Sequence, residues 1–422
     1  MKKIEERDKM TREEIQEKAL QLSLENPYMV LQYPTGLGKS FTVIKMVERI
    51  LNIYPYYNCL ILEPEIALID NLKKEFKKFH KEYLLDKINI ICYASLKNVK
   101  NYYSIIILDE AHHAFSELRL DWFSNAKIPK YMYLLSATLE TSQIKIFEKV
   151  VCAEFLVHRI TLKKAIEWGI LPTPKIGIFP LKLNETDINC YYEYTRGKKD
   201  KQIEIICEEE VKKWKYIKNK SAYPNLHLIV YCTEKQKYDQ LCYEAEMAKE
   251  RWNKNKNEKT KNYWLYTELC IKRFLSEIKT PYLDEFIQDV IDDGNRFVAF
   301  FGSVAQAEEL ANKHGGNLIA SKVGAKESQE LIEKFNNKEI NNLYCCKMIN
   351  EGVTLSDLEI GIIAQLDGNS GTFVQRAGRT LRGDIPFIYI FYYLNTKDTE
   401  YLEGVLSKVR KDYVDYLDYF LK

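Results

Sequence analysis

The sequence predicts an α/β protein with two parallel-sheet domains. Short apolar runs suited to buried strands alternate with helix-like segments over residues 28–135, and this alternation is typical of a parallel sheet. Polar motifs directly follow three of these runs, at residues 34–40, 109–112 and 136–138. Because ligands of open α/β sheets bind at the carboxyl ends of strands, these motifs predict one shared site. A second series of strand-like and helix-like runs begins at residue 295, so the two halves look like a duplicated architecture.

The composition indicates a globular protein without a membrane partner. Hydrophobic residues make up 46% of the chain and charged residues 29%, and no apolar run approaches the roughly 18 residues of a membrane span. The charged N-terminus lacks the apolar stretch of a signal peptide, so we expect a cytoplasmic protein of a bacterial cell or phage-infected host. The 10 cysteines form no Cys-x-x-Cys pair and are interpreted as reduced thiols. With a net charge of +2, a nucleic-acid partner would have to meet a local basic surface.

The chain divides into four segments. Residues 1–171 are interpreted as the first domain, with a charged, helical beginning over 1–27. Residues 172–184 contain a proline-interrupted linker and the first strand of the second half. Residues 185–292 are interpreted as a mainly helical insertion and residues 293–422 as the second domain. The C-terminal stretch 403–422 is predicted to be an amphipathic helix that packs on that domain.

The insertion is basic and rich in aromatic residues. Residues 211–279 hold 16 Lys and Arg against 8 Asp and Glu. One interpretation is a helical hairpin with a solvated lysine face and aromatic residues in its own small core. The other is a surface that contacts nucleic acid, because Lys and Arg bind phosphates and aromatic rings stack on bases. The two interpretations are compatible and both stay open.

Residues 34–40, Pro-Thr-Gly-Leu-Gly-Lys-Ser, lie between a predicted strand at 28–32 and a predicted helix from residue 41. A strand, a glycine turn and a helix are typical of a phosphate-binding loop. Glycines let backbone N–H groups close around an oxyanion, and the helix N-terminus favours negative charge. Lys39 can reach the outer phosphates, and the Ser40 hydroxyl can bind Mg²⁺. The strict pattern requires a glycine where Tyr33 stands, so this match is incomplete.

Two carboxylates follow the predicted strand at 104–108. Asp109 can hold Mg²⁺ through its water shell, and Glu110 can orient and deprotonate an attacking water. Phosphoryl transfer depends mainly on positioning and charge neutralisation, and Lys39 and Ser40 with this pair would provide most of both. Positive charge on the far side of the γ-phosphate is still missing from the set.

Residues 375–382, Gln-Arg-Ala-Gly-Arg-Thr-Leu-Arg, can supply that charge. A predicted helix over 372–380 places Arg376 and Arg379 on one face, and Arg382 continues the row. Alone, three such arginines could form a surface salt-bridge row; beside the other motifs, arginine fingers are favoured. Gln16, which lies 23 positions before Lys39, could read an adenine edge with its amide or could be a solvated helix residue.

Taken together, these motifs resemble those of superfamily 2 helicases of the DEAH-box kind, which have two RecA-like domains. The resemblance rests on residues 34–40, Asp-Glu-Ala-His at 109–112, Ser-Ala-Thr at 136–138 and residues 375–382, in the family's order. Weaker matches lie at 63–65, 93–96, 301–303 and 351–355. The resemblance covers about residues 1–175 and 293–395, and the family does not require the glycine that Tyr33 replaces. Residues 272–280 look, more loosely, like part of the helical insertions of small phage-type DEAH helicases.

The resemblance implies an ATP-dependent nucleic-acid helicase or translocase that uses ATP and Mg²⁺, with DNA favoured over RNA as partner. The implied nucleotide-binding residues are Gln16, Pro34, Thr35, Gly36, Leu37, Gly38, Lys39, Ser40, Gly352 and Arg376. The implied metal ligands are Ser40 and Asp109, and the implied catalytic residues are Lys39, Asp109, Glu110, Arg379 and Arg382. Coupling to movement would involve His112, Ser136, Thr138 and Gln375. The loops expected to hold one strand's backbone are marked by Pro64, Ser95, Ser303 and Thr354.

Three alternatives stay open. The chain could be the motor subunit of a restriction or defence complex, which would need a separate nuclease chain because no nuclease motif stands out. It could be a remodeller that switches with ATP and does not unwind. It could also be an RNA helicase. The sequence does not identify protein partners.

Overall fold

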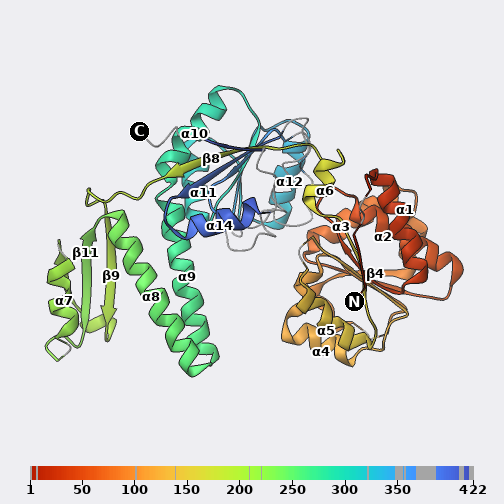
Figure 1. The fold of residues 1–422 in the computed structure, drawn as a ribbon, viewed down its shortest axis with the longest axis horizontal. Helices are drawn as coiled ribbons and strands as arrows, with labels where there is room; N and C mark the ends of the chain where they lie inside the picture. The colour runs from red at the N-terminus through yellow and green to blue at the C-terminus, as the bar shows by residue number, and fades with distance from the viewer. Residues whose placement is uncertain are drawn as a thin grey trace.

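The computed structural model describes residues 2–5, 8–99, 102–137, 139–208, 210–219, 221–320, 323–346, 355, 358–366, 386–407 and 413–417. These residues build two seven-stranded sheets and one three-stranded sheet (Figure 1). Both large sheets are parallel and are covered by helices, which confirms the prediction of an α/β protein with two parallel-sheet domains.

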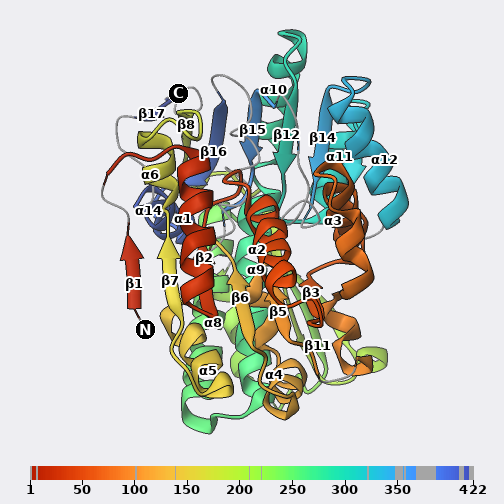
Figure 2. The same ribbon diagram turned by 90° about the vertical axis from the view of Figure 1, so that its right-hand side faces the viewer.

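The first domain has the strand order β1-β7-β2-β6-β5-β3-β4. Its strands are β1 (Lys2–Glu5), β2 (Tyr28–Gln32), β3 (Cys59–Glu63), β4 (Ile88–Cys92), β5 (Ile105–Leu108), β6 (Tyr131–Leu135) and β7 (Leu156–Arg159). Its α-helices are α1 (Arg12–Glu25), α2 (Lys39–Ile53), α3 (Ile66–Lys78), α4 (Glu117–Asn125), α5 (Thr141–Val151) and α6 (Leu162–Glu167). Helices α1, α2 and α3 share a core cluster on one face of the sheet, while α4 and α5 pack into a cluster on the other (Figure 2).

The order of the strands explains why distant motifs meet. Strands β2, β6 and β5 are neighbours in the sheet and run parallel. The phosphate-binding loop follows β2, Ser136 follows β6 and Asp109 follows β5, so all three motifs lie at the same edge of the sheet. The strands are nearly continuous apolar runs because helices bury both faces of the sheet.

The second domain has the strand order β13-β14-β12-β15-β16-β8-β17. Its strands are β8 (Lys175–Leu181), β12 (Phe297–Phe300), β13 (Leu318–Ile319), β14 (Asn342–Cys345), β15 (Ile360–Ile363), β16 (Phe387–Tyr393) and β17 (Val414–Tyr416). Helices α10 (Thr280–Asp292) and α11 (Val304–Lys313) pack on one face, and α12 (Ala325–Asn336) and α14 (Lys397–Leu406) pack on the other.

Between β8 and β12 the chain forms a separate module. Strands β9 (Cys190–Arg196), β10 (Ile203–Cys207) and β11 (Leu226–Cys232) make the three-stranded sheet, against which α7 (Glu210–Lys218) packs. Helices α8 (Glu234–Asn255) and α9 (Glu258–Glu277) then form a long antiparallel hairpin that extends from the second domain (Figure 1). The module is therefore helical after residue 232, whereas its first part is a mixed three-stranded sheet with one helix, α7.

Two terminal segments differ from their predictions. The interpretation of 1–27 as helical is wrong at its start, because Lys2–Glu5 form an edge strand parallel to β7. The predicted C-terminal helix over 403–422 is wrong in its extent. Helix α14 ends at Leu406, and Val414–Tyr416 add an edge strand beside β8. In both cases pairing with an existing sheet edge decides the conformation over the short-range pattern.

Candidate active site

The loop between β2 and α2 has the backbone of an anion-binding turn. Gly36 and Gly38 have φ values of 97° and 83°, in the left-handed region that favours glycine. Gly38 is the N-cap of α2, so Lys39 and Ser40 lie in the first turn of that helix. The free N–H groups of a helix N-terminus, together with the macrodipole, favour a bound phosphate here.

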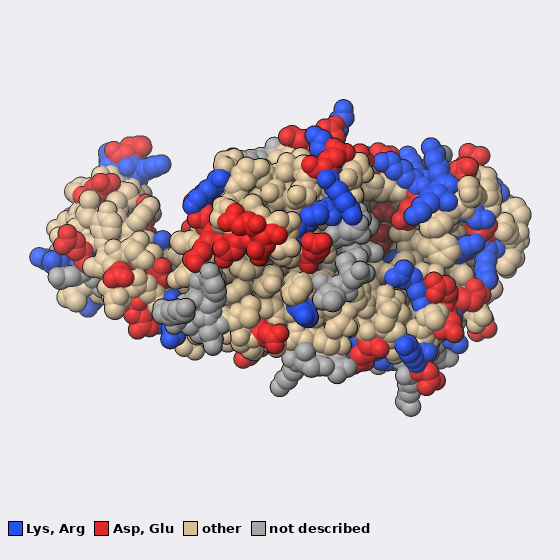
Figure 3. Space-filling model, turned by 90° about the horizontal axis from the view of Figure 1, so that it is seen from above, with Lys and Arg blue, Asp and Glu red and all other residues tan. Residues whose placement is uncertain are grey.

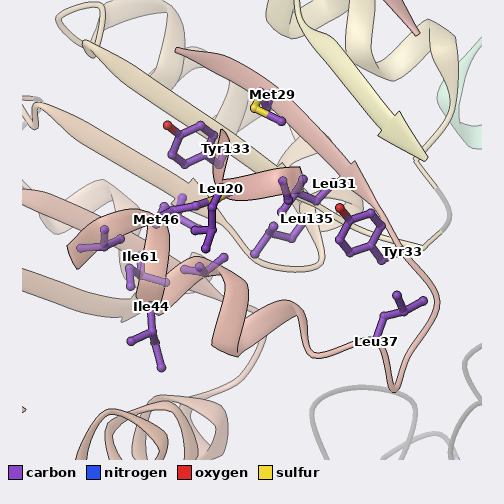
Figure 4. Packing of buried hydrophobic residues seen from close by; sticks show 14 of the residues in the cluster. Leu20, Met29, Leu31, Tyr33, Leu37, Ile44, Met46, Ile61, Tyr133 and Leu135 are labelled. Carbon is purple, nitrogen blue, oxygen red and sulfur yellow. The ribbon is translucent and has the colours of Figure 1, made fainter. Parts of the chain in front are cut away.

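Tyr33, the residue that breaks the strict glycine pattern, belongs to the core and not to the loop. Its side chain is fully buried, and its hydroxyl lies 2.6 Å from Nδ1 of His158 on β7. Figure 4 shows Tyr33 packed beside Leu31 and Leu135, while Leu37 lies at the turn of the loop. Tyr33 and Leu37 thus anchor both sides of the turn in the core beneath it.

Gln16 contacts the loop directly. Its side chain is buried on α1, and Nε2 donates a 3.1 Å hydrogen bond to the carbonyl of Leu37. A Cβ at Gly38 would lie 2.5 Å from this same nitrogen, so a larger residue would displace the Gln16 amide and would also be strained by the φ angle. The interpretation of Gln16 as a solvated residue is therefore wrong. Its proximity to the loop is compatible with the adenine role.

Lys39 and Glu110 form an ion pair at the centre of the site. Lys39 Nζ donates to Glu110 Oε1 at 2.7 Å, and both side chains are about nine-tenths buried. Glu110 has a left-handed backbone, with φ of 40°, directly after Asp109 at the end of β5. Such a backbone is strained for a non-glycine residue and is common at functional sites. Its backbone N–H donates to Asp109 Oδ1 at 2.9 Å, which holds the Asp109 carboxylate against the backbone of Glu110.

The third motif joins the second through a histidine. His112 Nδ1 lies 3.3 Å from Ser136 Oγ and 3.6 Å from Glu110 Oε2. Ser136 is fully buried at the end of β6. A continuous polar path therefore runs from Lys39 through Glu110 and His112 to Ser136. Thr138, the other residue predicted for this role, lies outside the described residues.

Two further carboxylates surround this path, and the sequence analysis assigned neither a role. Glu63, the last residue of β3, is 3% exposed, and its pKa is raised well above the ordinary value by burial, then by Asp109 and Glu110. Glu75 on α3 accepts a hydrogen bond from Ser40, and its burial raises the pKa of its carboxyl despite that bond. Glu63 could have been recognised from its place at a strand end next to β5. Glu75 gave no signal, because it stands among alternating charged residues of an amphipathic helix.

The residues present fit a nucleotide with Mg²⁺. The glycine turn offers backbone donors, and the hydroxyl of Ser40 and the carboxylate of Asp109 are the oxygen ligands that Mg²⁺ prefers. Glu110 Oε2 is buried without a hydrogen-bond partner among the described residues, as expected of a group that awaits a water. Within the described part of the chain, no three His, Cys, Asp or Glu side chains cluster closely enough to hold a metal ion.

The proposed residues of the second half lie mostly outside the description. Gly352, Thr354, Gln375, Arg376, Arg379 and Arg382 all fall among residues that the structure does not describe, so their predicted roles stay predictions. The strand that precedes the arginine segment is described. β15 ends at Ile363 and is the neighbour of β12 in the sheet, so Gln365 and Ser303 follow adjacent strands.

The predicted nucleic-acid residues lie at loop positions after strands. Pro64 follows β3, and Ser95 lies in a 3-10 turn after β4, its neighbour in the sheet. The carbonyl of Pro64 accepts a bond from Cys92 Sγ at 3.1 Å, which ties the two loops together. Ser303 caps α11 and accepts a hydrogen bond from the N–H of Gln306 at 3.2 Å. Nucleic-acid contact at these loops stays a prediction.

Two family models match the chain. The model described as Type III restriction enzyme, res subunit, matches residues 8–141, and the model described as Helicase conserved C-terminal domain matches residues 279–384. The first match contains the loop and the Asp109–His112 motif, and the second contains the arginine segment. A curated relative, the DNA 3'-5' translocase XPB2 of Sulfurisphaera tokodaii, is 23% identical over 395 residues, which cover 89% of this chain and 80% of the relative.

Solved structures of similar fold come from helicases. A variant of S. cerevisiae Dbp5 bound to RNA and ADP BeF3 has a TM-score of 0.57 at 13% identity and covers 96% of this chain and 89% of its own. The DUF1998 helicase MrfA bound to DNA has a TM-score of 0.55 at 13% identity, with 90% of this chain and 48% of that chain covered. At these identities the structures show that the fold is shared. Among the helices that the structure describes, none combines the length and the apolar character of a membrane span.

Proposed function

Because the chain is a superfamily 2 helicase with two RecA-like domains, an enzyme that hydrolyses ATP, we propose that it is a DNA translocase whose ATP site uses residues of both domains. The observation that carries the ATP site is the polar path in the first domain from Lys39 through Glu110 to Ser136, which joins three motifs at one sheet edge. The contribution of the second domain rests on the predicted roles of Arg379 and Arg382. DNA is preferred over RNA as the partner because the relative matched over most of both chains is described as a DNA translocase.

In this proposal each residue at the strand ends has a distinct task. Lys39 leaves Glu110 to contact the outer phosphates of ATP, and Glu110, then released, holds the attacking water and accepts its proton. Ser40 and Asp109 would hold Mg²⁺, which, when bound with ATP, neutralises phosphate charge. Gln16 contacts the adenine edge, and Arg379 and Arg382 stabilise the charge of the transition state from the second domain.

Hydrolysis must then be transmitted to nucleic acid. We assign this to His112 and Ser136, which lie 3.3 Å apart, because Glu110 contacts the same histidine. Loss of the γ-phosphate changes the position of Glu110 and so the contact between histidine and serine. Thr138 and Gln375 are proposed for the same coupling. The two domains would close around ATP while holding one nucleic-acid strand. Hydrolysis would let them open and advance along that strand.

The nucleic-acid contacts are proposed for two surfaces. Loops marked by Pro64, Ser95, Ser303 and Thr354 would hold the backbone of one strand. The tip of the α8–α9 hairpin supplies a second surface, which we call the tip lysines and define as Lys254, Lys256, Lys259 and Lys261, all exposed. In the same part of the hairpin, the rings of Trp252 and Trp264 stack with their centroids 4.8 Å apart.

A local basic surface is what the charge distribution requires. On the face shown in Figure 3, Lys and Arg side chains are interspersed with Asp and Glu side chains, so that this face has no single sign of charge. We assign phosphate contact on the hairpin to the tip lysines, all of which are exposed. Their proposed role is electrostatic and should weaken as salt rises.

The test is ATP turnover measured without nucleic acid and with single-stranded DNA, branched DNA, duplex DNA and RNA. We expect DNA to stimulate turnover more than RNA of the same length. Stimulation by RNA alone would replace the DNA assignment with an RNA helicase. A strand-displacement assay on the same samples separates a helicase from a remodeller, because a remodeller hydrolyses ATP without unwinding.

A second candidate function is favoured by one family match. Residues 8–141 match a model described as a restriction enzyme subunit, which fits the motor of a restriction or defence complex. The chemistry at Lys39 and Glu110 would be unchanged. A nuclease chain that co-purifies with this protein, and DNA cleavage that requires both chains and ATP, would support this function. Unwinding by the purified chain alone would favour the first proposal.

A further inference from the structure

A fully buried ion pair lies at the base of the hairpin. Lys279 and Asp398 both have side chains that are 0% exposed, and Nζ lies 2.7 Å from Oδ2. Lys279 Nζ also donates to the carbonyl of Ala364 and to Oε1 of Gln365, both at 3.1 Å. Gln365 Nε2 in turn donates to Asp398 Oδ1 at 2.9 Å. The three side chains of Lys279, Gln365 and Asp398 thus close a ring, which we call the buried ring.

The buried ring joins three parts of the second domain that lie far apart in the sequence. Lys279 lies between α9 and α10, where the hairpin enters the second domain. Gln365 lies two residues after the end of β15. Asp398 lies in the first turn of α14, and it also accepts the N–H of Tyr393 at 3.2 Å. Every polar atom of the Asp398 carboxylate is therefore used to hold another element.

Further contacts fix the hairpin to the same elements. The N–H of Lys397, next to Asp398, donates to the hydroxyl of Tyr238 on α8 at 2.9 Å, and its Nζ pairs with Glu268 on α9. Ser276, at the end of α9, exchanges hydrogen bonds with Gln306 on α11. Both helices of the hairpin are thus attached to α14 or α11, and the hairpin can move only together with these elements or by breaking these bonds.

Stability alone is a weak reason to bury such a pair. Burial lowers the pKa of Lys279, and the attraction of Asp398 opposes that shift, so removing the ammonium from water carries a cost. Apolar pairs of similar volume are often equally or more stabilising in this setting. A buried pair instead imposes one geometry, because each misplaced partner leaves an uncompensated charge. The buried ring therefore specifies where Gln365 lies relative to the hairpin.

The position of Gln365 matters for the ATP site. In sequence, Gln375 and the arginines that follow it begin ten residues after Gln365. Helix α9, with 20 residues, is about 30 Å long at 1.5 Å per residue. The first turn of α9 carries Lys259 and Lys261, two of the four tip lysines, and the last turn of α9 adjoins Lys279. A single rigid element therefore connects the proposed DNA contact to the strand that leads to the arginine segment.

We propose that Lys279, Gln365 and Asp398 are positioning residues that couple DNA binding at the hairpin to the rate of ATP hydrolysis. The buried ring touches neither ATP nor DNA; it holds the end of β15 in place relative to α9. This inference rests on the proposed function, because it requires that DNA stimulates turnover.

The test replaces the charges by a neutral pair that still forms hydrogen bonds, Lys279→Gln with Asp398→Asn. ATP turnover and KM for ATP are measured without DNA and with saturating single-stranded DNA, and DNA affinity is measured separately. We expect basal turnover, KM and DNA affinity within about twofold of wild type, while the stimulation by DNA falls about tenfold, within the usual range of coupling between sites. Undiminished stimulation in a folded variant would overturn the proposal.

Two further variants keep the test decisive. Lys235→Gln with Asp239→Asn makes the same change of charge in an exposed pair on α8, whose atoms lie 2.6 Å apart, and should leave stimulation unchanged.

If the double variant of the buried ring does not fold, Gln365→Met keeps the Lys279–Asp398 pair and removes only the amide that links it to β15. Stimulation by DNA should then fall with basal turnover retained, and full stimulation would again contradict the inference. Absence of stimulation in the wild-type protein would instead refute the proposed function.

Discussion

Lys39 and Glu110, 71 positions apart in sequence, are joined by a 2.7 Å hydrogen bond. The bond lies at the edge of the sheet where the carboxyl ends of β2, β6 and β5 meet. The lysine expected to bind phosphate is thus held by the carboxylate expected to act on water. In the proposed function, ATP competes with Glu110 for Lys39, and ATP binding frees Glu110 for the water. The proposal therefore links recognition of ATP and activation of the base through this one contact.

This contact predicts different behaviour for its two partners. Lys39→Ala removes a phosphate ligand and should weaken ATP binding about tenfold or more, whereas Glu110→Gln removes a competing charge and should bind ATP at least as tightly as wild type. Both variants should lose turnover by about 10²-fold or more, since loss of a general base alone costs that much. Equilibrium binding of a fluorescent ATP analogue and steady-state turnover measure the two effects. Lys45→Ala, a change of a half-exposed lysine on the same helix, is the matched control.

If Glu110→Gln bound ATP as weakly as Lys39→Ala, this would contradict the hypothesis that ATP and Glu110 compete for Lys39. Turnover near the wild-type rate in either variant would remove that residue from the site.

Ser136→Ala should separate hydrolysis from movement. The variant loses the contact with His112 Nδ1 at 3.3 Å and leaves Lys39 and Glu110 in place. DNA-stimulated turnover should stay within about threefold of wild type while strand displacement falls about tenfold, within the usual range for coupled sites. Ser142→Ala on the exposed surface of α5 serves as control. Equal losses of turnover and displacement would show that Ser136 acts in hydrolysis itself.

The raised pKa of Glu63 predicts that the stability of the folded chain depends on pH. Its pKa in the folded chain is raised well above the ordinary value of 4.5, so the folded chain retains a proton that the unfolded chain releases. Stability therefore falls as pH rises from the ordinary pKa toward the raised one. Glu63→Gln cannot ionise and should avoid this loss. Without ATP and Mg²⁺, its Tm should exceed that of wild type at about pH 8, and the difference should shrink toward about pH 4.

The exposed neighbour Glu65 provides the control for this measurement, because Glu65→Gln should leave Tm nearly equal to wild type at both pH values. If the Tm of Glu63→Gln differed from that of wild type by the same amount at both pH values, this would contradict a raised pKa of Glu63.

Reversing the tip lysines to Glu should weaken DNA binding and reduce its dependence on salt. Each lost phosphate contact should reduce the slope of log K against log salt by about 0.7 for single strands or 0.9 for duplex DNA. Titrations at several salt concentrations measure both quantities. The control reverses four exposed lysines elsewhere, Lys145, Lys149, Lys326 and Lys334. Equal effects in the two quadruple variants would mean that net charge alone, and not the tip, determines affinity.

The large sheets could be predicted from the sequence because their strands are buried on both faces. Continuous apolar runs such as 105–108 and 131–135 have no other plausible place than a covered parallel sheet. The motifs at their ends then had to meet, since carboxyl ends of parallel strands share one edge. Lys39, Glu110, His112 and Ser136 meet there, and Gln16 joins them from α1.

Other features left no readable pattern. Strands β9 and β10 each bury only one residue and leave aromatic or aliphatic side chains exposed, so they lack the alternation of buried apolar and exposed polar residues that marks a half-buried strand. Strand β1 exists only through its pairing with β7. Lys279 stood in a basic stretch, where a lysine is normally solvated; its burial depends on Asp398, 119 positions later, and no local signal could show that pair.

The central claim is that one ATP site takes residues from both domains, and turnover of Arg379→Ala with saturating single-stranded DNA tests it most directly. An arginine finger contributes on the order of 10³-fold or more to phosphoryl transfer. We therefore expect turnover to fall by about that factor while ATP still binds, and Arg49→Ala, a change on the outer part of α2, to retain the wild-type rate. Full turnover by Arg379→Ala would contradict the account, because the second domain would then contribute no finger at that position.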